Sequence, residues 1–288
     1  ARRHGAGAYQ YLYEIYLYAR RTQPMISCRK HVLPLVLLSC FATATYGQSD
    51  PSFANVAISL SEDHEGALGE RISLTLSSNS AQKIAQTLTQ WSGIEVQHVA
   101  KDALTLTMVL RPEYQGEVIK QYTSASFVID LDEDSTTQFT AAFATQYTGP
   151  FSVEEAEKYV SEYIDDTTYI HGFNFASTVA REKSGDCTEF AVLTTALMRA
   201  LGKPGRVVFG TVIIEDEVGV TAYGHAWTEV WHDNKWQVMD AALYGLDANK
   251  RFYLPGSVID NEGPGYGMSL ATGTILMPVK FYDVKSDS

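Results

Sequence analysis

The stretch Ser184–Gly202, SGDCTEFAVLTTALMRALG, constrains the fold more than any other part of the chain. Its apolar residues recur every three or four positions, which predicts a helix with one buried face that ends at Gly202. Asp186 is a suitable N-cap because its carboxylate can accept one of the unpaired N–H groups of the first turn. Cys187 then begins the helix, where the N–H donors and the helix dipole favour a thiolate. The charge of Asp186 opposes this effect, so activation of the thiol requires a base from elsewhere.

A hairpin supplies a candidate base. The runs Gly224–Trp231 and Lys235–Asp240 are rich in β-branched and aromatic residues and flank a turn around Asp233, which predicts strand, turn and strand. Either of the two tight turns that fit around Asp233 places His225 and Asp240 on the same face, because side chains alternate along a strand. An imidazole beside a carboxylate can take a thiol proton, while the carboxylate fixes the tautomer of the ring.

These segments resemble the transglutaminase-like superfamily, whose members are circularly rearranged relatives of papain-type cysteine enzymes. The family pattern is Gly-x-Cys and a helix, then A-L-G-x-P-x-R-V, a G-H-A-W-x-E-V strand and W-x-x-x-D. The matching positions are Gly185 and Cys187, Ala200–Val207, Gly224–Val230, and Trp236 with Asp240. The resemblance covers about residues 150–250. One departure concerns the end of the last strand, because Ala241 and Ala242 follow the aspartate where the family often has Pro-Thr.

The expected fold class is α+β. The resemblance implies a transglutaminase-like (papain-like) domain, over residues 126–288, in which the nucleophile helix packs on an antiparallel sheet. A β-rich N-terminal domain, of a sandwich-like kind, is expected over residues 48–125. Its predicted strands are Asn55–Leu60, Arg71–Leu76, Ile94–Val99, Leu104–Leu110 and Glu117–Tyr122. The run Ala81–Trp91 fits a helix or a strand, and Ile275–Tyr282 is expected to form a last edge strand.

The resemblance also implies roles for individual residues. Cys187 is the expected nucleophile, His225 the base and Asp240 the residue that orients the base. Three further residues are candidates for holding the oxyanion or lining the cleft: Tyr169, Asn174 and Trp227. The backbone N–H of Cys187 is another oxyanion donor, because it lies at a helix start.

The N-terminal region differs in composition from the rest of the chain. Residues 1–24 are rich in tyrosine, and we interpret them as translated upstream sequence rather than a membrane-surface segment. Residues 25–47 have the basic, apolar and small-residue regions of a signal peptide, and the apolar run is short for a membrane span. We therefore expect export, to the periplasm, without a transmembrane span. Leu37–Cys40 is a loose lipobox, so a lipid anchor at Cys40 is the alternative.

Removal of residues 1–47 changes the cysteine count and the charge. Cys187 is then the only cysteine, and an unpaired thiol in an oxidising compartment is explained either by catalysis or by burial as a small hydrophobe. The remaining chain has 16 basic and 33 acidic residues, a net charge of −17. Such a charge repels nucleic acid and anionic membranes, so neither is an expected partner.

The leading functional hypothesis is an exported thiol enzyme that cleaves or transfers amide or peptide acyl groups. Hydrolysis is favoured over transamidation because water is the default acceptor and bacterial members of the family often look hydrolytic. The expected partner is a protein or peptide substrate, with the cell envelope as a source. A binding or scaffolding module on the same fold is the alternative. No cofactor or metal is expected, because Cys187 and His225 lack the spacing of metal-ligand pairs and Asp130–Asp134 lacks that of a calcium loop.

Overall fold

The structure is a computed structural model that describes residues 54–167 and 173–287. The expected signal peptide, with Cys40, and the candidate Tyr169 lie outside the described residues. No helix within the described ranges is long and apolar enough to cross a membrane.

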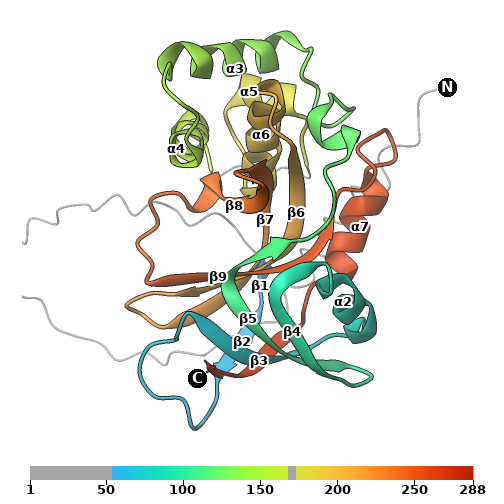
Figure 1. The fold of residues 1–288 in the computed structure, drawn as a ribbon, viewed down its shortest axis with the longest axis vertical. Helices are drawn as coiled ribbons and strands as arrows, with labels where there is room; N and C mark the ends of the chain where they lie inside the picture. The colour runs from blue at the N-terminus through green and yellow to red at the C-terminus, as the bar shows by residue number, and fades with distance from the viewer. Residues whose placement is uncertain (1–53, 168–172, 288) are drawn as a thin grey trace, which may run out of the picture. The chain divides into compact units, whose positions relative to one another are not determined.

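The first of two five-stranded sheets is antiparallel (Figure 1). Its strands follow the order β1-β7-β6-β9, and β8 pairs with β7. The bounds are β1 Ala54–Asn55, β6 Gly205–Glu215, β7 Val220–His232, β8 Lys235–Met239 and β9 Lys250–Val258. Helix α6, Cys187–Ala200, packs on β6 and β7, where Thr228 donates its hydroxyl to the Ala191 carbonyl at 2.9 Å. The expected helix on an antiparallel sheet is therefore confirmed.

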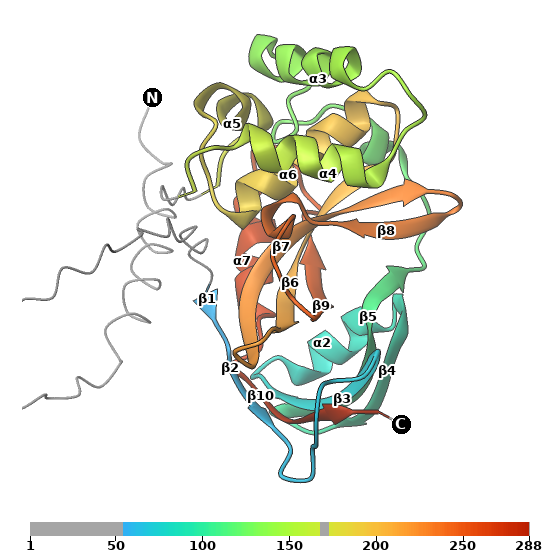
Figure 2. The ribbon, with the colours of Figure 1, turned by 90° about the vertical axis from the view of Figure 1, so that its left-hand side faces the viewer.

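Further helices cover the side of α6 away from the sheet (Figure 2). They are α3 Asp134–Gln146, α4 Val153–Tyr163 and α5 Ala176–Glu182. Ser152 caps α4 by accepting the Glu155 N–H at 3.3 Å. The prediction of one buried face on α6 is wrong, because twelve of its 14 residues are buried between the sheet and these helices. Phe190, Leu193 and Leu197 pack in one apolar cluster with residues of α3, α4 and α5, as expected for a helix that is covered on several sides.

The second sheet has the order β2-β10-β3-β5-β4. Its strands are β2 Ala57–Leu60, β3 Arg71–Ser77, β4 Trp91–Val99, β5 Ala103–Tyr114 and β10 Lys280–Ser286. Side chains of β3 alternate between buried and half-buried, as expected for a sheet with one face in the core. Helix α2, Ala81–Leu88, buries Ile84 and Leu88 in the same core, which resolves the ambiguous run as a helix.

Three expectations for these regions are corrected. The residues from 117 to 122 form no strand; a 3-10 helix, η1 at Lys120–Thr123, lies there instead. The second sheet packs against α2 and shares an apolar core with residues of the first sheet, so it is not a sandwich of two sheets of its own. The run from 275 to 282 contains the end of α7, Gly267–Ile275, and the start of β10, which lies between β2 and β3 rather than at an edge. This last placement depends on pairing across some 200 residues, about which a local pattern says little.

Strands from distant parts of the sequence link the two sheets. β1 precedes the second sheet in sequence but pairs with β7 of the first, whereas β10 follows the first sheet and pairs within the second. One apolar core contains residues of both sheets, such as Leu106 of β5 and Phe252 of β9. The predicted boundary between residues 125 and 126 stays a prediction, but the two regions do not separate as consecutive sheets.

Gly210 of β6 provides a test of packing in the first sheet. A Cβ atom there would lie 2.2 Å from the Leu254 carbonyl oxygen of β9 and 2.6 Å from the Trp227 ring. We expect Gly210→Ala to lower the free energy of unfolding by about 1–3 kcal/mol, because backbone atoms would have to move to make room for the methyl group. Gly149→Ala is the control, since a methyl group there would have no atom within 4 Å beyond the glycine itself and its two chain neighbours. Urea unfolding of both variants measures the difference, and equal midpoints would contradict the packing argument.

Candidate active site

The start of α6 is held by reciprocal hydrogen bonds. Asp186 accepts the Thr188 N–H at 2.9 Å, and the Glu189 carboxylate accepts the Asp186 N–H at 3.1 Å. Gly185 has a φ of 154°, and a Cβ atom on it would lie 2.3 Å from the Glu189 Cβ. A glycine is therefore required one residue before the cap, and the predicted N-cap is confirmed. The consequence is a fixed position for Cys187 as the first residue of the helix.

The hairpin turn lies at Asp233 and Asn234, which both have positive φ angles, 52° and 59°. Two positive φ angles define a type I′ turn, the common connection of a two-residue hairpin. Trp231 consequently pairs with Trp236, and Asp240 comes directly after β8. The register argument is confirmed, because Nε2 of His225 lies 2.8 Å from Oδ2 of Asp240.

The thiol lies beside the residue that follows His225. A hydrogen bond from the Ala226 backbone reaches Cys187. Along this edge of β7, β1 pairs with Gly224 and β8 begins to pair at Thr228. Between Gly224 and Thr228, none of the described strands pairs with this edge of β7. The start of α6 lies beside this unpaired part of the edge. The topology thus brings Cys187, His225 and Asp240 to one place in the fold.

The environment of Cys187 favours the protonated thiol. Burial raises the pKa of the Cys187 thiol well above its ordinary value, and the nearby charge of Asp186 raises it further. The Ala226 hydrogen bond acts in the opposite direction but does not offset the two. The expected opposition from Asp186 is confirmed, whereas the expected thiolate-favouring effect of the helix start is outweighed. Ionisation of this thiol requires proton transfer to a nearby base.

Asp186→Asn tests the electrostatic contribution to this pKa. The amide can still cap the helix, but it removes a negative charge that raises the Cys187 pKa. We expect iodoacetamide to alkylate Cys187 faster at pH 7 in this variant, with the pH–rate profile moved to lower pH. Mass spectrometry of Cys187 at a series of pH values measures the rate. Asp247→Asn, on an exposed loop, should match the wild type. Identical profiles for Asp186→Asn and the wild type would show that the charge has no influence.

The Asp240 carboxyl group is ionised and well bonded. Burial by itself would raise its pKa, but His225 and Tyr253 more than offset burial, so the pKa lies below its usual value. Tyr253 donates its hydroxyl to Oδ2 at 2.9 Å, and the Leu243 N–H donates to Oδ1 at 3.3 Å. An ionised carboxylate can only accept hydrogen bonds. The proton of a neutral His225 ring therefore lies on Nε2, which leaves Nδ1 as its basic nitrogen.

Two residues that contact Asp240 were not predicted from the sequence. Tyr253 reaches it from β9, and Glu157 of α4 accepts the Asp240 backbone N–H at 2.7 Å. Burial raises the pKa of Glu157, although this hydrogen bond lowers it in part. Neither residue belongs to a motif, and their contacts depend on how β9 and α4 pack against the hairpin. No local sequence signal could have identified them.

The remaining cleft candidates differ in position. The Asn174 backbone N–H donates to Glu189 at 2.9 Å, so this residue is tied to the first turn of α6. Its side-chain Nδ2 is buried and has no acceptor among the described residues. Trp227 is only 1% exposed and lies behind the imidazole, with its ring 6.2 Å from that of His225 and nearly parallel to it. Trp227 is thus buried against the imidazole, and its role in the cleft stays a prediction.

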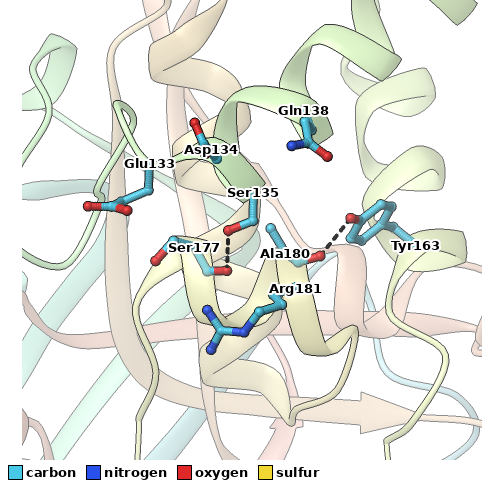
Figure 3. A pocket seen from close by; sticks show the side chains of 8 residues that line it. All are labelled: Glu133, Asp134, Ser135, Gln138, Tyr163, Ser177, Ala180 and Arg181. Carbon is cyan, nitrogen blue, oxygen red and sulfur yellow. Dashed lines mark hydrogen bonds between the residues drawn. The ribbon is translucent and has the colours of Figure 1, made fainter.

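A hollow of about 520 Å³ lies between α3 and α5, away from these residues (Figure 3). Its lining consists of Glu133, Asp134, Ser135, Gln138, Tyr163, Ser177, Ala180 and Arg181. Ser135 donates to the Ser177 carbonyl and Tyr163 to the Ala180 carbonyl, so both hydroxyl groups serve local structure. Asp130, from the acidic run, accepts the Ser177 N–H and hydroxyl. Across residues 54–167 and 173–287, no group of three or more His, Cys, Asp or Glu side chains is arranged to hold a metal ion.

Comparisons with known proteins identify the domain that contains the site. Similar solved structures include that of a proposed cysteine protease from Cytophaga hutchinsonii, with 12% identity over 64% of this chain and 77% of that chain, at a TM-score of 0.37. Another is the periplasmic domain of TgpA from Pseudomonas aeruginosa bound to ethylmercury, with 13% identity over 62% and 74% of the two chains, at a TM-score of 0.39. No curated protein matches the sequence. The sequence model of the transglutaminase-like superfamily matches residues 136–241, from the first turn of α3 to just past Asp240. The chain therefore carries a domain of the transglutaminase-like superfamily.

Proposed function

We propose that the protein is an exported thiol enzyme that cleaves or transfers amide or peptide acyl groups through an acyl-enzyme. The observation that carries the proposal is the hydrogen-bonded pair of His225 and Asp240, with an Nε2–Oδ2 distance of 2.8 Å, beside the helix start that bears Cys187. These side chains provide a nucleophile, a base and a group that orients the base. Burial of all three supports the proposal, because electrostatic interactions are stronger where water is excluded.

In the first half-reaction the Cys187 sulfur attacks the carbonyl carbon of the amide. The thiol proton passes to Nδ1 of His225, a carbon–sulfur bond forms, and the carbonyl oxygen becomes an oxyanion. When the carbon–nitrogen bond breaks, the imidazolium returns its proton to the leaving amine, and a thioester remains on Cys187. Asp240 stabilises the imidazolium through the Nε2–H bond during this step. Since burial keeps the resting thiol protonated, proton transfer accompanies the attack.

Two donors are suited to the oxyanion. The backbone N–H of Cys187 is the first of the helix and is directed out of its N-terminal end. The Asn174 amide adds a buried Nδ2 for which the described residues supply no acceptor. A buried donor without an acceptor costs about 1–3 kcal/mol, and a substrate oxyanion would recover this cost. The Trp227 ring N–H is also buried without an acceptor among the described residues, but the Asn174 backbone N–H is bonded to Glu189 in the first turn of α6, close to Cys187, so we assign the role to Asn174.

In the second half-reaction an acceptor attacks the thioester. His225 removes a proton from the acceptor, the carbon–sulfur bond breaks, and the proton returns to the Cys187 sulfur. Water as the acceptor gives hydrolysis, and a primary amine gives transamidation. We favour hydrolysis, because water is present at about 55 M, whereas transamidation requires a site that holds the amine.

The proposed location and substrate class rest on the N-terminal sequence. Residues 25–47 have the pattern of a signal peptide, and we infer export to the periplasm, with lipid attachment at Cys40 as the alternative processing. An enzyme in this compartment meets proteins and peptide cross-links of the cell envelope. We therefore infer a protein or peptide substrate.

Mass spectrometry of a peptide library tests the proposal. The protein is incubated with glutamine-containing peptides, with and without a primary amine, beside Cys187→Ala as a matched control. Chain cleavage would identify a peptidase, deamidation a side-chain amidase, and amine incorporation a transferase. All three outcomes require an acyl group on Cys187, which acid quenching traps for peptide mapping. Wild-type products identical to those of Cys187→Ala would contradict an enzyme and favour a binding module.

A further inference from the structure

One oxygen of Asp240 receives two hydrogen bonds from two different strands. Oδ2 accepts from Nε2 of His225 on β7 at 2.8 Å and from the Tyr253 hydroxyl on β9 at 2.9 Å. The other oxygen accepts the Leu243 N–H at 3.3 Å. The backbone of Asp240 is held separately, by Glu157 at 2.7 Å. The Tyr253 hydroxyl is therefore the side-chain group that shares Oδ2 with the imidazole.

Tyr253 cannot take part by touching a substrate. It is 1% exposed, and its ring packs edge-on against Trp227 with centroids 5.3 Å apart at 67°. Trp227 in turn lies nearly parallel to the His225 ring. The rings of Tyr253, Trp227 and His225 thus pack against one another in sequence. The hydroxyl of Tyr253, as distinct from its ring, therefore acts on a reaction through Asp240 and His225.

We propose that Tyr253 is a positioning residue: its hydroxyl fixes the rotation of the Asp240 carboxylate and shares the charge of Oδ2, which sets the orientation and basicity of His225. This inference rests on the proposed function, to which it adds a fourth residue. Removal of the hydroxyl leaves Oδ2 with the imidazole as its one side-chain donor. The carboxylate charge would then be shared with one donor fewer and would stabilise the imidazolium more strongly, so the ring would keep its proton to a higher pH. The carboxylate would also rotate more freely, because one of its hydrogen bonds is lost.

The proton affinity of His225 depends on several charged and titratable groups around Asp240. These groups are His225 on β7, Tyr253 and Arg251 on β9, Glu157 on α4, Arg111 on β5 and Cys187 on α6. Arg111 also lies over the Tyr253 ring, 5.8 Å from its centroid. A shift in one variant must therefore be compared with a variant that leaves this cluster intact.

Tyr253→Phe removes the hydroxyl and keeps the ring. Tyr159→Phe is the matched control, since Tyr159 is also buried and donates its hydroxyl at 2.8 Å, but to the Phe139 carbonyl. Two measurements are made on the full protein. Proton NMR follows the downfield Nε2–H resonance of His225, assigned by its loss in His225→Ala. Kinetics on the substrate found in the library follow kcat/KM against pH.

In Tyr253→Phe we expect the Nε2–H resonance of His225 to be displaced. We expect kcat/KM to fall about tenfold or more, through a lower kcat, and the acidic limb of the profile of kcat/KM against pH to move to higher pH. Tyr159→Phe should keep the wild-type resonance and profile. An unchanged resonance in Tyr253→Phe, with or without a loss of activity, overturns the proposal. If the wild type transfers no acyl group, the proposed function fails, but the resonance still decides whether Tyr253 positions the pair.

Discussion

Cys187→Ala is expected to reduce acyl transfer by roughly 10⁴-fold or more while the protein stays folded. The variant removes the sulfur atom that forms the covalent bond, and no other cysteine exists within the described residues to replace it. The loss of a small buried side chain at the start of α6 costs little stability, on the order of 1 kcal/mol. Rates are measured with the peptides found in the library, and folding with urea unfolding.

His225→Ala supplies the cross-check on the same mechanism. The thiol is buried and its pKa is raised, so it depends on the imidazole to lose its proton. The His225 variant should therefore approach the loss of Cys187→Ala, and the double variant should be no slower than Cys187→Ala alone. Losses that multiply would mean that the two residues act independently. Residual activity within tenfold of the wild type in Cys187→Ala would exclude the acyl-enzyme.

Local rules of the sequence were sufficient for the parts of the site that lie near one another along the chain. The helix start at Cys187 follows from a cap, a glycine and an apolar period. The contact between His225 and Asp240 follows from a tight turn and the alternation of side chains. In each case the decisive geometry spans fewer than 20 residues, so pairing over long distances does not affect it.

The parts that could not be predicted depend on packing between distant segments. Tyr253 reaches Asp240 because β9 pairs with β6 rather than with β8. The raised pKa of Cys187 reflects burial, which a cap and a helix dipole do not reveal. β10 joins the second sheet by pairing with β3, which lies at the opposite end of the described chain. Burial and long-range register are properties of the complete fold.

Two residues of the family-like motifs have a structural role instead. Arg206 and Glu229 form an ion pair in which both side chains are 2% exposed, and Nε of Arg206 lies 3.0 Å from Oε2 of Glu229. The second carboxylate oxygen accepts from the Trp91 ring N–H at 2.8 Å, and the guanidinium lies 3.3 Å from the centroid of the Tyr114 ring. Trp91 and Tyr114 belong to the second sheet, so this pair joins the two sheets.

Glu229→Ala is expected to lower the free energy of unfolding by about 3–5 kcal/mol, because it leaves the Arg206 charge buried without its partner. The double variant Arg206→Met/Glu229→Leu removes both charges and replaces their volume. We expect it to be more stable than Glu229→Ala, although it carries one more substitution. Urea unfolding with a constant m-value measures both.

The exposed pair of Lys158 and Glu162 is the control for this comparison. Its atoms are 3.8 Å apart and its side chains are 49% and 62% exposed, so Glu162→Ala should change stability by less than about 0.5 kcal/mol. A Glu229→Ala variant as stable as Glu162→Ala would show that water or another group replaces the lost carboxylate. A double variant less stable than Glu229→Ala would instead show that the charges are favourable in themselves. The expected order, with Glu229→Ala lowest, follows only if the cost comes from an unpaired charge at the junction of the sheets.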